Sequence, residues 1–158
     1  MIIRKAKLDD IDAISQLITK LVIKHIIPTC SKGGGQLILN SMAPNCISGY
    51  LSAGYEYHVA ELNGEIMAAV GMKENTHLYH LFVADAQQGK GLSRTLWEHA
   101  KNVCLGKGNP GKFTVNSALN AVDVYLKFGF LPVSGVREKC GVKDMPMELN
   151  IVNPVVVN

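Results

Sequence analysis

The sequence predicts an α/β fold in which helices cover the faces of a mixed sheet. Three observations support this prediction: a helical pattern follows a short apolar strand at the N-terminus, a β-hairpin signal lies near the middle, and strands alternate with helices after residue 76. The chain has 158 residues, of which 47% are hydrophobic, so one core can form without disulfides or metals. We therefore expect a single domain over residues 1–158, with residues 151–158 as a flexible tail.

The first third of the chain starts regularly and then becomes irregular. Residues 2–6 predict a short strand, after which Asp9 can cap a helix whose apolar residues recur at helical spacing and which Pro28 is expected to end. A run of three glycines and further turn residues then interrupt residues 30–54. We expect loops and short helices there, at the mouth of a site.

A two-residue turn gives the clearest local signal. Asn63-Gly64 lies between strands at 55–62 and 65–72, and both central positions of a type I′ turn need the positive φ that these residues tolerate. The remaining elements follow in order: a strand at 76–83, a turn at 84–90, a helix at 91–105 ended by Gly106, a strand at 113–116, a helix at 120–128 ended by Gly129, and a strand pair at 131–137 and 145–151.

Composition and charge exclude several classes of protein. The formal net charge is +3, far from the dense basic stripe that nucleic-acid binding usually shows. The longest apolar stretch, residues 14–27, is interrupted by polar residues and is too short to span a bilayer. The four cysteines are widely spaced and the N-terminus does not resemble a signal peptide, so we expect reduced thiols and a cytoplasmic protein. We predict no nucleic-acid partner and no membrane partner.

A glycine-rich turn is the sharpest candidate site. In LFVADAQQGKGLSR a buried strand leads through Gly89 and Gly91 into the start of a helix. The free amides and dipole of a helix start favour an anion, glycine lets the backbone approach it, and Lys90 and Arg94 add positive charge. The same glycines also fit a plain tight turn. A dinucleotide fingerprint and a P-loop both fail, because Arg94 and Phe113 stand where those motifs need glycine and Ser or Thr.

Two segments resemble motifs of one enzyme family. Gln88-x-x-Gly91-x-Ser93 is similar to the acyl-CoA pyrophosphate loop of the GNAT superfamily of N-acetyltransferases, Q/R-x-x-G-x-G/A, with Ser93 as a departure. Ala121-x-x-x-Tyr125-x-Lys127-x-Gly129-Phe130 resembles the next motif, A-x-x-x-Y-x-K-x-G-F, although Ala118 stands where many members have asparagine. The resemblance implies an acetyl-CoA-dependent N-acetyltransferase with a central, mostly antiparallel sheet that splays between the strands at 76–83 and 113–116.

The resemblance also implies where the co-substrate acetyl-CoA binds. Its pantetheine arm would lie against the main chain of Leu81 and Val83, in keeping with the pairing of amides to a free strand edge. Asn116 or Asn120 would replace the missing asparagine, although each also suits a strand end or a helix cap. The implied cofactor-binding residues are Leu81, Phe82, Val83, Gln88, Gly89, Lys90, Gly91, Leu92, Ser93, Arg94, Asn116, Asn120 and Tyr125.

Acetyl transfer to an amine needs a base, a stabilised oxyanion and a proton for the departing thiolate. The resemblance places His77 where many members carry the base, and imidazole accepts protons near neutral pH. Tyr125 is the candidate general acid, because a phenol stays protonated at neutral pH. Both side chains also suit ordinary packing. Backbone amides near Val83 are implied as the oxyanion donors.

Two more residues of the strand at 76–83 are reserve candidates for the base. Regular alternation places His77 on one face with Tyr79 and Leu81, and His80 on the other face with Leu78, whereas a bulge would exchange these faces. Tyr79 and His80 are the reserves. We predict no metal site, because His77 and His80 have no third ligand in sight.

The acceptor is expected to be a primary amine of a small molecule or peptide, attacked directly in a ternary complex. The resemblance implies a pocket shaped by His25, Thr29, Tyr50 and the hairpin at 138–143, where Glu138 or Asp144 would hold an ammonium group or simply face solvent. Two other functions stay open, a catalytically silent acyl-CoA sensor and a nucleotide-phosphate binder. Exposed strand edges and the apolar residues 154–157 suggest a homodimer.

Overall fold

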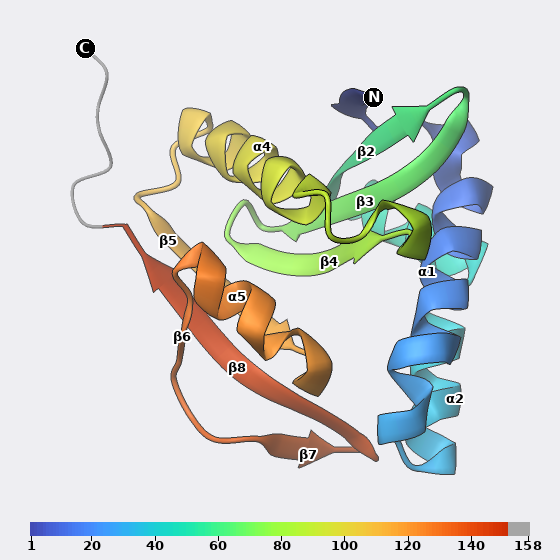
Figure 1. The fold of residues 1–158 in the computed structure, drawn as a ribbon, viewed down its shortest axis with the longest axis vertical. Coiled ribbons are helices and arrows are strands. Elements are labelled where there is room, and N and C mark those ends of the chain that lie inside the picture. The colour runs from blue at the N-terminus through green and yellow to red at the C-terminus, as the bar shows by residue number, and fades with distance from the viewer. Residues whose placement is uncertain (152–158) are drawn as a thin grey trace.

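The computed structural model describes residues 1–151, which build an open sheet with helices on both faces (Figure 1). Within these residues eight strands follow the order β1-β2-β3-β4-β5-β8-β6, with β7 paired to β8. Neighbouring strands run antiparallel except for β4 and β5, which are parallel. The expected mixed, mostly antiparallel sheet is confirmed.

The strands are β1 (Ile2–Lys5), β2 (Glu56–Leu62), β3 (Glu65–Lys73), β4 (His77–Val83), β5 (Lys112–Ser117), β6 (Leu131–Pro132), β7 (Arg137–Lys139) and β8 (Val142–Asn150). The helices are α1 (Ile11–His25), α2 (Lys32–Ser41), α3 (Pro44–Ser52), α4 (Leu92–Gly106) and α5 (Val122–Phe128). Short 3₁₀ turns lie at Leu8–Asp10, Ile27–Thr29, Asp85–Gln87 and Leu119–Ala121. Most of the tail expected at 151–158, including the apolar residues 154–157, lies outside the described residues.

The sheet consists of a meander that separates from a second group of strands. The predicted hairpin joins β2 to β3 through Asn63 and Gly64, whose φ angles are 51° and 80°. β4 follows β3 directly, but it pairs with β5 only near its start, through His77 with Thr114 and Leu78 with Val115. Beyond these pairs the two strands diverge (Figure 1), so each is left with an unpaired edge. The splay expected between these strands is present.

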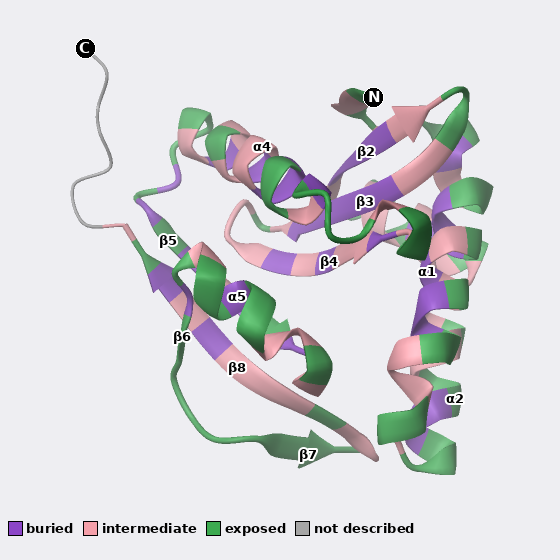
Figure 2. Ribbon diagram, viewed as in Figure 1, coloured by how far each residue is buried: buried purple, intermediate pink, exposed green. Residues whose placement is uncertain are grey.

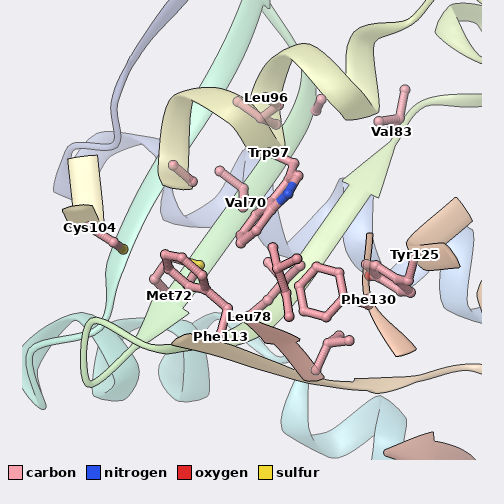
Figure 3. Packing of buried hydrophobic residues seen from close by; sticks show 14 of the residues in the cluster. Val70, Met72, Leu78, Val83, Leu96, Trp97, Cys104, Phe113, Tyr125 and Phe130 are labelled. Carbon is pink, nitrogen blue, oxygen red and sulfur yellow. The ribbon is translucent and has the colours of Figure 1, made fainter. Parts of the chain in front are cut away.

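Each face of the sheet has its own buried core (Figure 2). Under α4, Trp97 packs edge-on against Phe113 with ring centroids 5.3 Å apart, and its centroid lies 5.5 Å from that of Phe130 (Figure 3). On the other face, α1 buries Ile14 and Ile18 completely. Burial of such large apolar side chains stabilises each layer by about 1.5–3 kcal/mol per residue. The two cores therefore hold both walls of the splayed region in place.

The segment expected to hold loops and short helices folds into α2 and α3. Glycine disfavours helix, which is why the run of three glycines favoured a loop. A tertiary contact reverses this preference, because a Cβ at Gly34 would lie 2.3 Å from the carbonyl oxygen of Gly141, in the turn between β7 and β8. Ser31 caps α2 by accepting from the Gly34 N–H at 3.1 Å, and its own N–H donates to the Gly141 carbonyl at 3.0 Å. The small residues thus dock α2 on the β7–β8 hairpin.

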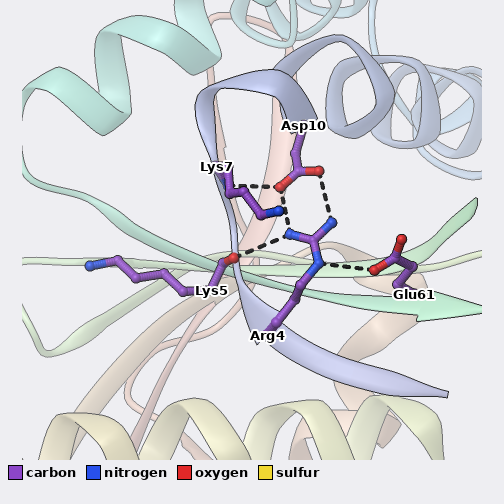
Figure 4. A network of polar contacts seen from close by, with 5 residues as sticks. All are labelled: Arg4, Lys5, Lys7, Asp10 and Glu61. Atoms are coloured by element: carbon purple, nitrogen blue, oxygen red, sulfur yellow. Dashed lines mark hydrogen bonds and ion pairs between the residues drawn. The ribbon is translucent and has the colours of Figure 1, made fainter. Parts of the chain in front are cut away.

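The first helix begins one residue later than predicted. Asp10, and not Asp9, stands at the N-cap of α1, and its carboxylate accepts from the Lys7 N–H at 2.7 Å. The Arg4 guanidinium donates to both oxygens of that carboxylate, at 2.8 and 3.0 Å, and to Glu61 on β2 at 3.0 Å (Figure 4). The hydrogen bond from Arg4 lowers the pKa of Asp10. The network joins β1, α1 and β2.

Two further boundaries differ from the predictions. α1 ends at His25, ahead of Pro28, which lies in a 3₁₀ turn. The strand expected at 131–137 is replaced by the two-residue β6, a connecting segment and β7. β7 forms a hairpin with β8 through Cys140 and Gly141, whose φ angles are 53° and 77°. β8 consequently starts before the predicted residue 145 and reaches α2.

Candidate active site

A cleft of about 520 Å³ opens where β4 and β5 diverge. Its walls come from β4, the turn into α4, the start of α5 and the end of α1, with α2 and β8 at the far end. The predicted site residues that line it are His77, Leu81, Phe82, Val83, Gln88, Gly89, Gly91, Leu92, Ser93, Asn116, Asn120 and Tyr125. The structure thus brings both candidate proton-transfer residues and the glycine turn to one cavity.

The glycine turn presents a row of free amide donors. Gly89 and Gly91 have φ angles of 76° and 78°, and a Cβ at either position would meet no atom within 4 Å. The first amide of α4 to find a backbone acceptor is that of Thr95, which donates to the Gly91 carbonyl at 3.0 Å. Gln88 Nε2 donates to the Val83 carbonyl at 3.2 Å and holds the turn to the end of β4. Free donors, a helix dipole and open space beside glycine fit a pyrophosphate group.

The two cations of this turn lie outside the lining of the cleft. The Arg94 guanidinium donates to the Lys127 carbonyl at 3.0 Å, and it lies 5.2 Å from the centroid of the Phe128 ring. Arg94 therefore ties the start of α4 to the end of α5. Lys90 is exposed. Both cations thus add positive charge near the turn, whereas the cavity is lined by Gln88, Gly89, Gly91, Leu92 and Ser93.

Tyr125 combines core packing with access to the cleft. Its ring centroid lies 5.7 Å from that of Phe130 (Figure 3) and 6.0 Å from that of Phe128, both in edge-on geometry. The residue also lines the cavity. Burial raises the pKa of the phenol above its ordinary value, so the hydroxyl stays protonated at neutral pH. The sequence posed packing and proton donation as alternatives, whereas this geometry is compatible with both.

A β-bulge in β4 changes the faces expected for its side chains. Gly71 of β3 stands opposite His80 and Met72 stands opposite Leu78, so Tyr79 is the extra residue. Leu78 packs in the core under α4, whereas the His80 and Tyr79 rings lie side by side, with centroids 4.3 Å apart. The side chains of β4 therefore do not alternate regularly between the two faces of the sheet. The strand has the bulge that the sequence analysis gave as the alternative to regular alternation.

His77 lines the cleft where β4 and β5 part. Its Nδ1 lies 2.7 Å from the Thr114 hydroxyl on β5. Burial lowers the pKa of this imidazole, and the positive charges of Lys73 and Arg137 lower it further. The ring is therefore neutral at neutral pH. When Nδ1 carries the hydrogen and donates it to Thr114, the other ring nitrogen is an acceptor that can take up a proton.

The far end of the cleft is formed by α2 and β8. Apolar side chains of both elements line it, together with Lys143 and Asp144. Arg137 holds the Asp144 carboxylate, with nitrogen–oxygen distances of 2.5 and 3.3 Å. The charge expected to meet an ammonium group is thus already paired. Three residues expected to shape this pocket are not part of the lining: Thr29, Tyr50 and Glu138.

Polar contacts at the end of α1 connect the two rims of the cleft. Asn120 Nδ2 donates to the His25 carbonyl at 3.2 Å, and His25 Nε2 lies 2.9 Å from Asp85 Oδ1. Lys24 Nζ lies 2.6 Å from the second oxygen of Asp85, and these two hydrogen bonds lower the pKa of that carboxyl. The Asn116 side chain, in contrast, makes no hydrogen bond within residues 1–151. Asn116 is therefore the freer of the two predicted amides.

One polar pair beside the cleft was missed by the sequence reasoning. The Tyr57 hydroxyl lies 2.7 Å from Nδ1 of His80, which lines the cavity. Tyr57 belongs to β2 and His80 to β4, and these strands are separated by β3. The two residues come together only through the register of the sheet, so no local sequence motif predicts this pair.

Comparison with known proteins decides the family. A family model described as an acetyltransferase (GNAT) domain matches residues 26–151. The chain belongs to the GNAT acetyltransferase family. Membership of this family implies acyltransferase activity. A comparison with curated protein sequences finds no match to this GNAT chain.

Solved structures agree with the GNAT fold. A GCN5-related N-acetyltransferase from Rhodopseudomonas palustris is 18% identical, with a TM-score of 0.79 over 95% of both chains. The PaiA N-acetyltransferase from Thermoplasma acidophilum, solved with coenzyme A, is 16% identical, with a TM-score of 0.75 over 95% of this chain and 98% of its own. YncA from Salmonella typhimurium, solved with acetyl-CoA, is 20% identical, with a TM-score of 0.67 over 100% and 98%. At these identities the likeness shows the fold.

No helix within residues 1–151 combines the length and the apolarity of a membrane span. In the same part of the GNAT chain, no three His, Cys, Asp or Glu side chains gather as metal ligands do.

Proposed function

We propose that this GNAT chain is an N-acetyltransferase that transfers the acetyl group of acetyl-CoA to a primary amine of a small molecule or peptide. One observation carries the proposal: a single cleft runs from the free amides of the glycine turn, along the unpaired edge of β4, to His77 and Tyr125. These features match the three parts of an acyl-CoA. The free amides suit the pyrophosphate, the strand edge suits the amides of the pantetheine arm, and the two proton-transfer groups suit the thioester. Residues 1–158 would act as one domain.

The cleft would bind acetyl-CoA through backbone groups and one free side chain. The amides of Gly89 to Ser93 would hold the pyrophosphate, and the free edge of β4 at Leu81 and Val83 would pair with the amides of the pantetheine arm. The side chain of Asn116 would supply the amide contact that Ala118 lacks. Phe82, Leu92 and Asn120 also line the cleft, whereas Lys90 and Arg94 contribute charge from outside it.

Each chemical role falls to a residue that faces the cleft. Acetyl-CoA supplies a thioester whose carbonyl carbon the amine attacks directly. His77, or a water that it holds, accepts the proton that the attacking nitrogen loses. The Tyr125 hydroxyl donates a proton to the departing thiolate sulfur, and backbone amides near Val83 stabilise the carbonyl oxygen. His77 and Tyr125 return to their starting states when a proton passes between them through solvent.

The first test is thermal unfolding of the purified protein with acetyl-CoA, CoA and ATP in parallel. Ligand at about 100 times its Kd adds about 2.7 kcal/mol, and each kcal/mol raises the midpoint by about 2–4 °C for a chain of this size. A rise with both CoA species and not with ATP supports the cleft assignment. No rise with either CoA species refutes it.

A panel of amines then tests turnover, with release of free CoA as the readout. Acetylation that disappears in His77→Ala, while CoA binding persists, supports the role of His77. CoA binding without acetylation of any amine would instead favour the acyl-CoA sensor.

The same samples report the oligomeric state by light scattering, which tests the homodimer that we also propose. With Cys30, Cys46, Cys104 and Cys140 as free thiols, we propose the cytoplasm as its location.

A further inference from the structure

A buried polar pair stands beside the cleft without a role in the proposed chemistry. The Tyr57 hydroxyl and His80 Nδ1 are 2.7 Å apart, and the residues are only 1% and 5% exposed. Burying a phenol and an imidazole is costly unless their polar atoms are satisfied. Nδ1 of the imidazole is satisfied by Tyr57, and the structure shows no hydrogen bond from Nε2 to any of residues 1–151.

The sheet makes room for this pair at one position. Gly71 of β3 stands opposite both residues, since Tyr57 and His80 are its register partners on the two neighbouring strands. A Cβ at Gly71 would lie 2.5 Å from two atoms of the Tyr57 ring. The missing side chain therefore lets the ring lie across β3, and the hydroxyl reaches β4.

The hydrogen bond fixes which nitrogen of His80 carries the proton. Burial raises the pKa of Tyr57, so the phenol keeps its hydrogen. If Nδ1 were the donor, that hydroxyl hydrogen would be left without an acceptor in the core, at a cost of about 1–3 kcal/mol. The hydroxyl therefore donates, Nδ1 accepts, and the ring hydrogen resides on Nε2. Burial also lowers the pKa of His80 to about 3, so the ring is neutral and Nε2–H is a permanent donor.

Because aromatic rings surround His80, its Nε2–H group can find an acceptor only in the cleft. Aromatic rings stand around the imidazole, with centroids 4.3 Å away for Tyr79, 5.7 Å for Phe82 and 6.1 Å for Tyr50. His80 lines the cleft, and along β4 it lies between His77 and Leu81. In the proposed function these are the base and the first residue that pairs with the pantetheine arm. In that arrangement the acyl group lies between His77 and the strand edge that pairs with the pantetheine arm, and His80 lines this stretch of the cleft.

On the basis of the proposed N-acetyltransferase activity, we propose that His80 Nε2–H donates a hydrogen bond to the carbonyl oxygen of the bound thioester, and that Tyr57 is the positioning residue that fixes this tautomer. When the amine nitrogen forms its bond to the carbonyl carbon, the electron pair of the C=O double bond moves onto the oxygen. The pair returns as the carbon–sulfur bond breaks and the thiolate leaves with both electrons of that bond. His80 stabilises the charge on oxygen without giving up its proton, while His77 and Tyr125 carry the protons.

Infrared spectroscopy of the binary complex tests this donor without an acceptor amine. With acetyl-CoA labelled by ¹³C at the carbonyl, a hydrogen bond from His80 lowers the carbonyl stretching frequency relative to free acetyl-CoA. We expect the shift to become smaller in His80→Leu, because only the backbone donors remain, to be partly restored in His80→Gln, whose amide also donates, and to be reduced to a lesser extent in Tyr57→Phe. Tyr55→Phe is the matched control, because it removes a hydroxyl from a neighbouring ring that does not line the cleft.

Turnover provides the second readout. Loss of one oxyanion donor lowers kcat by about 10²–10³-fold in well-studied enzymes, so we expect a fall of this order for His80→Leu and a smaller one for Tyr57→Phe. The KM for acetyl-CoA should stay within about threefold, because the donor acts on developing charge. A carbonyl frequency that His80→Leu does not change, in a protein that still binds acetyl-CoA, overturns the role of His80. Equal effects of Tyr57→Phe and Tyr55→Phe overturn the role of Tyr57. Absence of acetyl-CoA binding to the unaltered protein instead overturns the proposed function itself.

Discussion

The contact between α2 and the β7–β8 hairpin predicts opposite effects for two neighbouring glycines. Alanine in a helix is favoured over glycine by about 0.5–1 kcal/mol. At Gly33 a Cβ meets nothing within 4 Å, so Gly33→Ala should gain this stability. At Gly34 the Cβ would lie 2.3 Å from the Gly141 oxygen, 2.4 Å from its carbonyl carbon and 2.9 Å from the Cys140 oxygen. These are backbone atoms, and forced repacking of this kind costs about 1–3 kcal/mol.

The difference between the two variants isolates the contact, since both carry the same substitution in the same helix. We expect Gly34→Ala to be less stable than Gly33→Ala by about 1–3 kcal/mol, or roughly 2–12 °C in the unfolding midpoint at about 2–4 °C per kcal/mol. Urea titration followed by circular dichroism measures the free energies, and thermal scans measure the midpoints. If Gly34→Ala proves as stable as Gly33→Ala, then α2 does not pack against the Gly141 turn as described.

Three other predictions concern the cleft. The pKa of His80 is about 3 in the folded protein and about 6.5 in the unfolded chain, so between these pH values only the unfolded chain binds the proton. The free energy of unfolding should therefore fall as the pH drops below 6.5, by about 2 kcal/mol at pH 5. Urea titrations at pH 7 and pH 5 should show that loss diminished in His80→Gln, and equal losses would contradict the burial of a neutral ring. Gly91→Ala places a side chain at a φ of 78° and beside the proposed phosphate site, so calorimetry should show the CoA affinity reduced at least about tenfold. Gly106→Ala, at the opposite end of α4, should leave that affinity unchanged. Tyr125→Phe should lower kcat by about 10²-fold or more at unchanged CoA affinity, and a kcat within threefold of the unaltered protein would remove Tyr125 as the acid.

The elements that the sequence predicted well are those whose signals are local. Asn63-Gly64 forces a hairpin by its own φ preferences, Gly129 ends α5 with a φ of 100°, and the glycine turn lies at the start of α4 as expected. The two GNAT motifs likewise predicted that Gly91 and Tyr125 belong to one site, and both residues line the cleft; each motif is a short local segment, one at the start of α4 and one along α5.

The features that the sequence did not predict depend on contacts between distant residues. Short helices were expected at 30–54, but the contact between Gly34 of α2 and the Gly141 turn was not, because no short window of sequence contains both residues. The bulge at Tyr79 appears only in the register of β4 against β3, and it decides which side chains accompany His80. Asp10 replaces Asp9 as the cap because Arg4, on β1, holds its carboxylate.

The divergence of β4 from β5 also bears on aggregation. An unpaired strand edge is a template on which foreign chains can build sheet, and many proteins hide such edges with charge, proline or a covering helix. Here the edge lies inside the molecule, between residues of α1 and α5 that line the same cleft. The edge of a sheet in another folded protein is too bulky to pair with β4 inside this cleft, whereas a single extended molecule is narrow enough to bind along the strand. Past Leu78, the β4 amides that point into the gap have no partner strand, whereas those on the other side pair with β3. Hydrogen exchange of the amides in the gap would be fast in the empty protein and would slow when a ligand occupies the slot.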